Sequence, residues 1–313
     1  MQERHAALLA LLQALSDRRY DFVTPTPETQ RRVIRRARPP GPATLRDVFG
    51  WSLPFDEADL PGDLLYLAGK GGVLGRRGRR LVSRVRVSSL GGSLFLHSAY
   101  PTREKDAVFL GPDSYRFADF IERELMAGAG PIKSVVDVGA GAGVGALTAA
   151  RLRPAASLLM TDVNPKALRY ARVNAAFAGF QADYRLSDGL NDAPGPFDLV
   201  LANPPYIAGR TGVEGRTYRD GGAMLGAGLS LEWAEAAMDR LGPDGRLLLY
   251  TGSAIVAGED RLRAALEGAA RSRGCDLRYR EIDPDVFGEE LSRPEYREAE
   301  RIAVIAAVAT KGR

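Results

Sequence analysis

The chain has 313 residues, of which 45% are apolar and 26% are charged. This is an ordinary globular composition with enough length for two domains, and it excludes a wholly disordered chain. No segment approaches the ~20 consecutive apolar residues of a membrane span, and the first residues do not resemble a signal peptide. We therefore expect a cytoplasmic protein that makes no contact with a membrane.

The content of cysteine and histidine is low. Cys275 is the single cysteine, which excludes an internal disulfide framework and a cysteine-based metal cluster. His5 and His97 are the two histidines, and we interpret both as ordinary surface or packed imidazoles. We expect no metal site.

The positive charge is concentrated in the first third of the chain. Residues 1–110 contain 18 lysines and arginines against 11 aspartates and glutamates, so their net charge is +7, whereas the remainder carries −3. The arginines gather in two clusters: Arg31, Arg32, Arg35, Arg36 and Arg38, and then Arg76, Arg77, Arg79, Arg80, Arg84 and Arg86. Such clusters are typical of a surface that binds nucleic acid or an acidic partner, and equally of a solvated arginine-rich face.

Residues 1–108 have a pattern of short helices followed by a hairpin. Apolar spacing predicts helices over residues 3–15 and 27–37, the second with Thr26 as N-cap, and two shorter ones over 45–50 and 59–68. A break at residues 39–42 separates them. A glycine- and arginine-rich stretch at 69–80 then leads into a predicted strand at 81–87, which turns at Gly91-Gly92 into residues 94–97. We expect a winged-helix-like basic domain, which can contact nucleic acid, contact a protein or dimerise.

Residues 109–313 alternate between strand and helix patterns. From residue 132 the predicted elements are 132–138, 144–152, 157–162, 165–177, 183–187, 197–202, 230–241, 246–251, 260–273, 276–282 and 301–309. Such alternation predicts an α/β fold with a doubly wound, mostly parallel sheet.

Polar and glycine residues follow several of these strands. Asp137 lies in the first strand and is followed by Gly139, Ala140, Gly141 and Gly143, a run that lets the backbone approach a nucleotide-like ligand at a helix N-terminus. Asp162 ends the second strand, 19 positions after Gly143, where a carboxylate can accept both ribose hydroxyls. Its alternative role, an N-cap for the next helix, suits Asn164 better.

Asn203-Pro204-Pro205-Tyr206 follows the apolar strand 197–202. The Asn203 side-chain oxygen and the Pro204 carbonyl can both accept from one NH₂ group, which orients a planar nitrogen. Two prolines stiffen the turn, and Tyr206 can stack on the planar group. Together with the glycine run that follows Asp137, this turn predicts methyl transfer to nitrogen.

The two motifs in this order resemble the class I S-adenosylmethionine-dependent methyltransferases, in the branch that contains protein-glutamine N5 and adenine N6 methyltransferases. The resemblance covers residues 109–310 and implies a seven-stranded sheet whose closing strand is antiparallel. It implies that S-adenosylmethionine contacts Asp137, Gly139, Ala140, Gly141, Gly143, Asp162, Val163, Asn164, Asp188, Gly189 and Asn203. In this family Asp188 would take the adenine amino group, although an ordinary turn aspartate is the alternative. Asn203, Pro204, Pro205 and Tyr206 would hold the acceptor.

Other functions remain open at this point. The glycine run also satisfies a dinucleotide fingerprint, but an NAD enzyme offers no role for Asn203-Pro204-Pro205-Tyr206. The motif does not separate a protein glutamine from a nucleobase or from a small natural product. A nucleic-acid-binding protein with a non-catalytic methyltransferase-like core is a further alternative.

Overall fold

The computed structural model describes residues 2–36, 41–102, 104–128, 130–193, 195–209 and 220–313. Arg38 of the first arginine cluster and the predicted break at Pro39 and Pro40 lie outside these residues. The chain divides into two compact units. The first contains residues 1–116, 141–144 and 165–181, and the second contains residues 117–140, 145–164 and 182–313. The predicted domain boundary after residue 108 stays a prediction.

The first unit contains short helices, two β-hairpins and one helix from the later part of the chain. Its elements are α1 Gln2–Asp17, α2 Pro27–Ile34, α3 Leu45–Phe49, η1 Glu57–Asp59, α4 Gly62–Lys70, β1 Leu74–Arg77, β2 Arg80–Ser83, β3 Val85–Leu90, β4 Ser93–Ser98 and α7 Pro165–Phe177. β1 pairs with β2, and β3 pairs with β4, both antiparallel. The N-caps Thr26 and Thr44 accept from the backbone of α2 and α3 respectively, which explains where these helices begin.

The predicted single strand at 81–87 is wrong, because two strands meet there. The Ser83 hydroxyl donates to the Val85 carbonyl at 2.6 Å and accepts from the Val85 N–H at 3.2 Å. These local bonds satisfy the backbone in place of a continuing ladder, so β2 ends and β3 begins. β1 was also missed, since its residues 74–77 are mostly glycine and arginine.

His97 is a packed imidazole, as the sequence predicted for it. It lies in β4 with 1% of its surface exposed, and its Nε2 is 2.8 Å from the Ser88 hydroxyl. Burial holds the pKa of His97 well below its usual range, and the nearby Arg86 lowers it further.

The second unit is built on one large sheet. Its elements are α5 Pro112–Met126, which begins in the first unit, β5 Ser134–Val138, α6 Val144–Leu152, β6 Ser157–Asp162, β7 Asp183–Leu186, β8 Phe197–Ala202, η2 Met224–Gly226, α8 Gly228–Met238, β9 Leu241–Val256, β10 Glu259–Asp260, α9 Arg261–Ser272, β11 Cys275–Asp283, η3 Gly288–Ser292, η4 Pro294–Tyr296 and β12 Arg301–Lys311.

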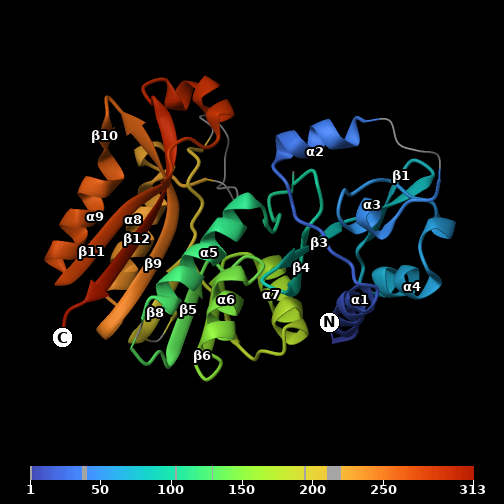
Figure 1. Ribbon diagram of the computed structural model, residues 1–313, viewed down its shortest axis with the longest axis horizontal. Helices are drawn as coiled ribbons and strands as arrows, with labels where there is room; N and C mark the ends of the chain where they lie inside the picture. The colour runs from blue at the N-terminus through green and yellow to red at the C-terminus, as the bar shows by residue number, and fades with distance from the viewer. Residues whose placement is uncertain (1, 37–40, 103, 129, 194, 210–219) are drawn as a thin grey trace. The chain divides into compact units, whose positions relative to one another are not determined.

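The strand order of the sheet is β11-β12-β9-β8-β5-β6-β7, with the short β10 pairing with β9 (Figure 1). β5 to β9 run parallel along this path, and β12 lies antiparallel between β9 and β11. The doubly wound, mostly parallel α/β fold and its antiparallel closing strand are thus confirmed. The described sheet has eight strands because β10 adds one to the expected seven.

The two faces of this sheet bury different sets of side chains, as the two-residue period of a strand requires. α8 and α9 pack on the face that contains Val136, Val200 and Leu249. On the other face, Phe117 of α5 contacts Tyr250 of β9 at 6.0 Å between ring centroids. Burial on both faces explains why these strands read as continuous apolar runs.

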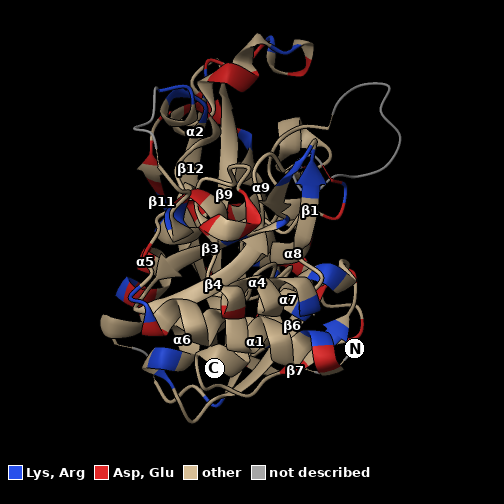
Figure 2. Cartoon of the chain, turned by 90° about the vertical axis from the view of Figure 1, so that its right-hand side faces the viewer, with Lys and Arg blue, Asp and Glu red and all other residues tan. Residues whose placement is uncertain are grey.

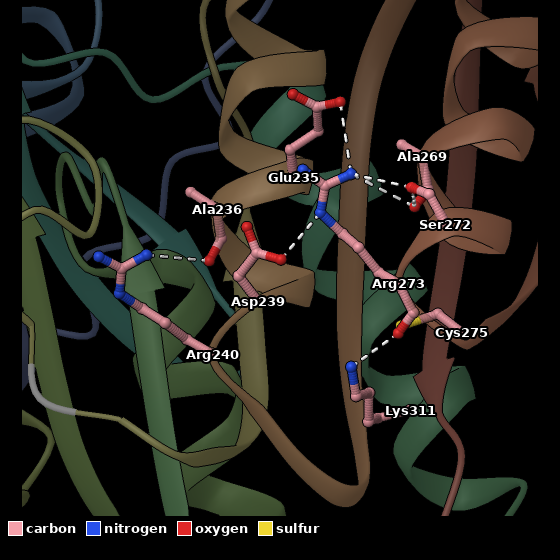
Figure 3. A network of polar contacts seen from close by, with 9 residues as sticks. All are labelled: Glu235, Ala236, Asp239, Arg240, Ala269, Ser272, Arg273, Cys275 and Lys311. Atoms are coloured by element: carbon pink, nitrogen blue, oxygen red, sulfur yellow. Dashed lines mark hydrogen bonds and ion pairs between the residues drawn. The ribbon is translucent and has the colours of Figure 1, made fainter.

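A polar network joins the ends of α8 and α9 to the sheet (Figure 3). The Arg273 guanidinium donates to Asp239 at 2.9 Å and lies 3.6 Å from Glu235, both near the end of α8. The Lys311 ammonium of β12 donates to the Arg273 carbonyl at 2.7 Å. Cys275 follows as a buried residue at the start of β11, which confirms its role as a small apolar side chain. None of the helices in the described ranges is long and apolar enough to cross a lipid bilayer.

Candidate active site at the carboxyl edge of the sheet

The register of three neighbouring strands brings the predicted motifs to one edge. Val138 of β5 pairs with Thr161 of β6 on one side and with Ala202 of β8 on the other. The next residue along each chain segment is Gly139, Asp162 and Asn203, so these three form one row at the carboxyl edge of the sheet. Because strands lie ~4.8 Å apart, Asp162 and Asn203 flank Gly139 with their backbones ~10 Å from each other.

Asp137 is almost fully buried beside the first turn of α6. It is 2% exposed, and its Oδ2 accepts from the Ala146 N–H at 2.8 Å. A methyl group on Gly145 would lie 2.8 Å from the same carboxylate, so glycine permits this close approach. Burial raises the pKa of Asp137 to about 7, against the hydrogen bond from Ala146, and the nearby Asp162 adds to the rise. The carboxyl group therefore holds the first turn of α6 close to β5.

The glycines after β5 have the backbone conformation that the sequence predicted. The φ angles of Gly139, Gly141 and Gly143 are 64°, 55° and 83°, in the region that favours glycine. The Ala140 N–H donates to the carbonyl of Thr161 at 2.9 Å, which fastens this loop to the end of β6. The loop thus turns sharply between β5 and α6.

Trp233 of α8 packs against two glycines of this edge. A Cβ on Gly139 would lie 2.4 Å from the Trp233 ring, and a Cβ on Gly189 would lie 3.3 Å from its Nε1. Gly189 also has a positive φ of 58°. The indole, which is 9% exposed, therefore requires glycine at both positions.

Asn174 of α7 supports the same loop within the first unit. Its amide nitrogen donates to the Ala142 carbonyl at 2.9 Å and to the Leu96 carbonyl at 3.1 Å. Its oxygen accepts from the Leu96 N–H at 2.8 Å. Since Asn174 is fully buried, these bonds fasten the glycine-rich loop to β4.

Asp162, Val163 and Asn164 form a turn at the end of β6. Asp162 Oδ1 accepts from the Asn164 N–H at 2.8 Å, and Asp162 is partly exposed. Val163 is 64% exposed, which is unusual for a large aliphatic side chain beside a buried strand. The turn presents one carboxylate and one apolar side chain on the same edge.

Asp188 lies two residues beyond β7 and is exposed. Its carbonyl accepts from the Asn191 N–H at 3.3 Å, as in a turn. The Ser187 N–H donates to the Asp162 carbonyl at 3.1 Å, so this turn is joined directly to the end of β6.

Asn203-Pro204-Pro205-Tyr206 leaves the sheet at the end of β8. Asn203 is partly exposed, and its side-chain amide makes no hydrogen bond to another residue in the described part of the chain. Tyr206 is 7% exposed, with its ring against Gly252 of β9 and 5.8 Å from the Phe287 ring. Protein atoms therefore cover much of the Tyr206 ring that the sequence assigned to stacking.

A loop from late in the chain holds the residues that follow Tyr206. The Tyr296 hydroxyl accepts from the Ala208 N–H at 2.7 Å and donates to the Leu225 carbonyl at 3.1 Å. The Arg293 guanidinium donates to the Ala208 carbonyl at 2.8 Å and forms an ion pair with Glu290 at 2.7 Å. Tyr296 is 1% exposed. Through these contacts, the segment with Arg293 and Tyr296 and the segment with Leu225 hold the residues that follow Tyr206 in place.

Two glycines complete this packing from the segment before α8. A Cβ on Gly226 would lie 2.4 Å from the Tyr206 carbonyl, and a Cβ on Gly221 would lie 2.6 Å from the Pro205 carbonyl. The Gly221 N–H donates to the Ile207 carbonyl at 2.9 Å. Sequence reasoning missed Tyr296, Arg293 and Trp233. Among the residues that the structure describes, no cluster of acidic, histidine or cysteine side chains could hold a metal ion.

Residues 121–255 match the family model of the methyltransferase small domain. The chain is similar to a release factor glutamine methyltransferase of Cereibacter sphaeroides, 39% identical over 136 residues, which are 40% of this chain and 49% of that protein. It is 28% identical over 213 residues to a release factor glutamine methyltransferase of Deinococcus radiodurans, covering 67% of this chain and 74% of that protein.

A shorter match of 75 residues is 39% identical to a ribosomal RNA small subunit methyltransferase C of Serratia proteamaculans, covering 24% of this chain and 22% of that protein. The chain thus spans about half of the Cereibacter relative and a smaller part of the Serratia one.

The fold is also found among solved structures. Trm5b from Pyrococcus abyssi superposes with a TM-score of 0.51 over 81% of this chain and 72% of that chain, at 15% identity. This likeness concerns the fold alone. Residues 121–255 of this chain are thus similar to the methyltransferase small domain, and they lie on a doubly wound, mostly parallel sheet.

Proposed function

We propose that the protein transfers a methyl group from S-adenosylmethionine to the side-chain amide nitrogen of a glutamine in another protein. The observation that carries this proposal is the row of Gly139, Asp162 and Asn203 at one sheet edge. A glycine loop and the partly exposed Asp162 carboxylate lie there beside the turn that begins at Asn203, and this combination supports a site for S-adenosylmethionine next to an NH₂ acceptor.

The residues at this edge fit S-adenosylmethionine. Asp162 would accept from the ribose hydroxyls, and the backbone N–H groups at the start of α6 would face the polar end of the cofactor. The exposed Val163 offers an apolar surface for the flat adenine ring. When bound, the cofactor supplies a methyl group on a positively charged sulfur with a neutral leaving group.

Asn203 and Pro204 position the acceptor nitrogen. The Asn203 side-chain oxygen and the Pro204 carbonyl accept one hydrogen each from the NH₂ group, which turns its lone pair out of the amide plane. With the cofactor bound, that lone pair would accept its methyl group as the neutral thioether leaves, and the nitrogen would then lose one proton to water. Positioning of the nitrogen and electrostatic stabilisation suffice for methyl transfer, so the site needs no strong base to deprotonate the NH₂ group first.

The relatives favour a glutamine amide as the acceptor. The two matches of 136 and 213 residues are both to release factor glutamine methyltransferases. A nucleobase amine is the second candidate, which the 75-residue match to a ribosomal RNA methyltransferase favours. Both acceptors present the same planar NH₂ to Asn203.

The test combines cofactor binding with transfer of labelled methyl groups. Purified protein is incubated with radiolabelled S-adenosylmethionine and either a glutamine-containing bacterial release factor or ribosomal RNA. Label on the glutamine nitrogen of the protein supports the proposal, and label confined to RNA moves the acceptor to a nucleobase. Cofactor binding without label in either macromolecule would refute the proposal.

Two variants separate the roles of the edge residues. Asn203→Ala is expected to keep cofactor affinity in calorimetry and to lose methyl transfer, whereas Asn191→Ala, a matched change on an exposed turn, should retain both. Asp162→Ala is expected to weaken cofactor binding, since a hydrogen bond to a charged group contributes ~1.5 to 3 kcal/mol. Normal turnover by the Asn203 variant would rule out the role given to this side chain.

A further inference from the structure

The β1–β2 hairpin carries arginines that the proposed reaction does not use. Arg76, Arg77, Arg79 and Arg80 lie on its two strands and turn, and Arg84 follows β2. All five are exposed, and β1 stands out as a positively charged strand in Figure 2. Every cationic residue of this hairpin is arginine, which binds phosphate through a planar fork.

Three of these side chains lie on the same face of the hairpin, which we call the arginine face: Arg77, Arg80 and Arg84. Arg77 pairs directly with Arg80, and residues opposite each other share a face. Gly75 is two residues before Arg77, and a Cβ on Gly75 would lie 3.0 Å from the Arg84 Nε. The Arg84 side chain therefore lies across Gly75 on this same face.

Packing alone does not account for this arrangement. Like charges directly opposite each other in a hairpin destabilise it by a few tenths to ~1 kcal/mol. Arg80 has an exposed ion pair with Asp56 at 3.5 Å and a long one of 3.9 Å with the partly buried Asp59. Within the described ranges, neither Arg77 nor Arg84 forms an ion pair. Two guanidinium groups thus lack an acidic partner among the residues that the structure describes.

The base of the hairpin is firmly held, so the backbone that carries its arginines has a defined geometry. Leu81 and Phe55 exchange two backbone hydrogen bonds of 2.9 Å, and both side chains are buried. The Arg84 N–H donates to the Val73 carbonyl at 2.7 Å. Rigid presentation lowers the entropy that is lost on binding a partner.

We infer that the arginine face of the β1–β2 hairpin docks on the phosphate backbone of a nucleic acid. Protein interfaces bury aromatic or large apolar side chains at their centre, whereas Val82 is the only apolar side chain that the described strands β1 and β2 place on this face. Spaced guanidinium groups without an apolar centre suit a repeating anion instead. This binding is independent of which NH₂ group the protein methylates.

The test measures binding of a fluorescent single-stranded RNA of mixed sequence by anisotropy, as a function of KCl. The variant carries Arg77→Gln, Arg80→Gln and Arg84→Gln, and the control carries Arg261→Gln, Arg271→Gln and Arg280→Gln, three exposed changes of the same total charge. Loss of three phosphate contacts should lower the salt slope by about 2, which corresponds to roughly 20-fold over a fourfold change in salt. The control should retain most of the wild-type slope.

A second variant keeps the charge by combining Arg77→Lys, Arg80→Lys and Arg84→Lys. It should retain the salt slope of the wild type but bind RNA more weakly. A retained slope also shows that substitution of these three residues leaves the hairpin folded. The inference is overturned if the wild type fails to bind RNA at low salt, or if the hairpin and control glutamine variants bind alike. It is also overturned if polyglutamate competes as well as unlabelled RNA, which would indicate an acidic protein partner. Methyl transfer to protein is measured separately, so failure of one proposal is distinguishable from failure of the other.

Discussion

Replacing Asp137 by asparagine should stabilise the protein by an amount that grows with pH. The carboxyl group is 2% exposed, and burial raises its pKa to about 7. A raised pKa in the folded state means that the protonated form is favoured by folding. The contribution of Asp137 to stability is therefore fully present below the ordinary pKa of 3.8 and is lost as pH rises toward 7.

The size of the stability loss follows from the pH range between the ordinary pKa of 3.8 and the raised pKa of about 7. Each pH unit between the two values removes up to ~1.4 kcal/mol of stability, and the loss levels off above the folded pKa. In the Asp137→Asn variant the side-chain amide oxygen would still accept from the Ala146 N–H. Because the amide carries no charge, this loss is absent from the variant.

The assay is thermal unfolding of the wild type and the variant without cofactor, at several pH values from 5 to 8. The variant should gain in melting temperature relative to the wild type as pH rises toward neutrality, and the gain should then level off. Asp183→Asn, an exposed change at the start of β7, serves as the matched control and should follow the wild type. A difference between variant and wild type that stays constant across this range would contradict the raised pKa.

Two further changes test the supports of the site. Tyr296→Phe leaves the Ala208 N–H and the Leu225 carbonyl without their partner, which costs about 1 to 3 kcal/mol of stability. Methyl transfer should fall while cofactor affinity stays unchanged. Normal methyl transfer would show that these two hydrogen bonds do not position the turn that contains Asn203. Gly139→Ala places a methyl group against Trp233 at a φ of 64°, which costs ~1 to 2 kcal/mol in backbone conformation alone. Calorimetry should show weaker cofactor binding, and unchanged affinity and stability would be inconsistent with the close contact.

Much of the second unit could be predicted because its elements are strongly patterned. The bounds of α6, β6, α7 and β8 agree with the sequence prediction, since apolar runs and glycine or proline residues mark their ends. The predicted helix at 230–241 was less accurate, because Leu241 already begins β9. Element ends without such a marker depend on contacts made elsewhere in the fold.

The supports of the site could not be predicted, because their partners are far apart along the chain. Tyr296 contacts Ala208 across 88 residues, and no local pattern distinguishes it from other tyrosines. Trp233 reads as an ordinary apolar residue of α8, and only its contact with Gly139 shows why that glycine cannot be larger. Asn174 reads as an ordinary polar residue of a helix, yet it is fully buried against Leu96 and Ala142.

The residues that reach the edge of the sheet follow from the pattern of the chain. Parallel strands end at the same edge of a sheet, so Gly139, Asp162 and Asn203 had to gather there, with Asp137 two residues before Gly139 in β5. How these residues are held is decided by the folded structure instead. Burial raises the pKa of Asp137, and the Tyr296 hydroxyl holds the backbone after Tyr206. These depend on packing between segments distant in sequence, where the chain carries no repeating signal that could reveal them.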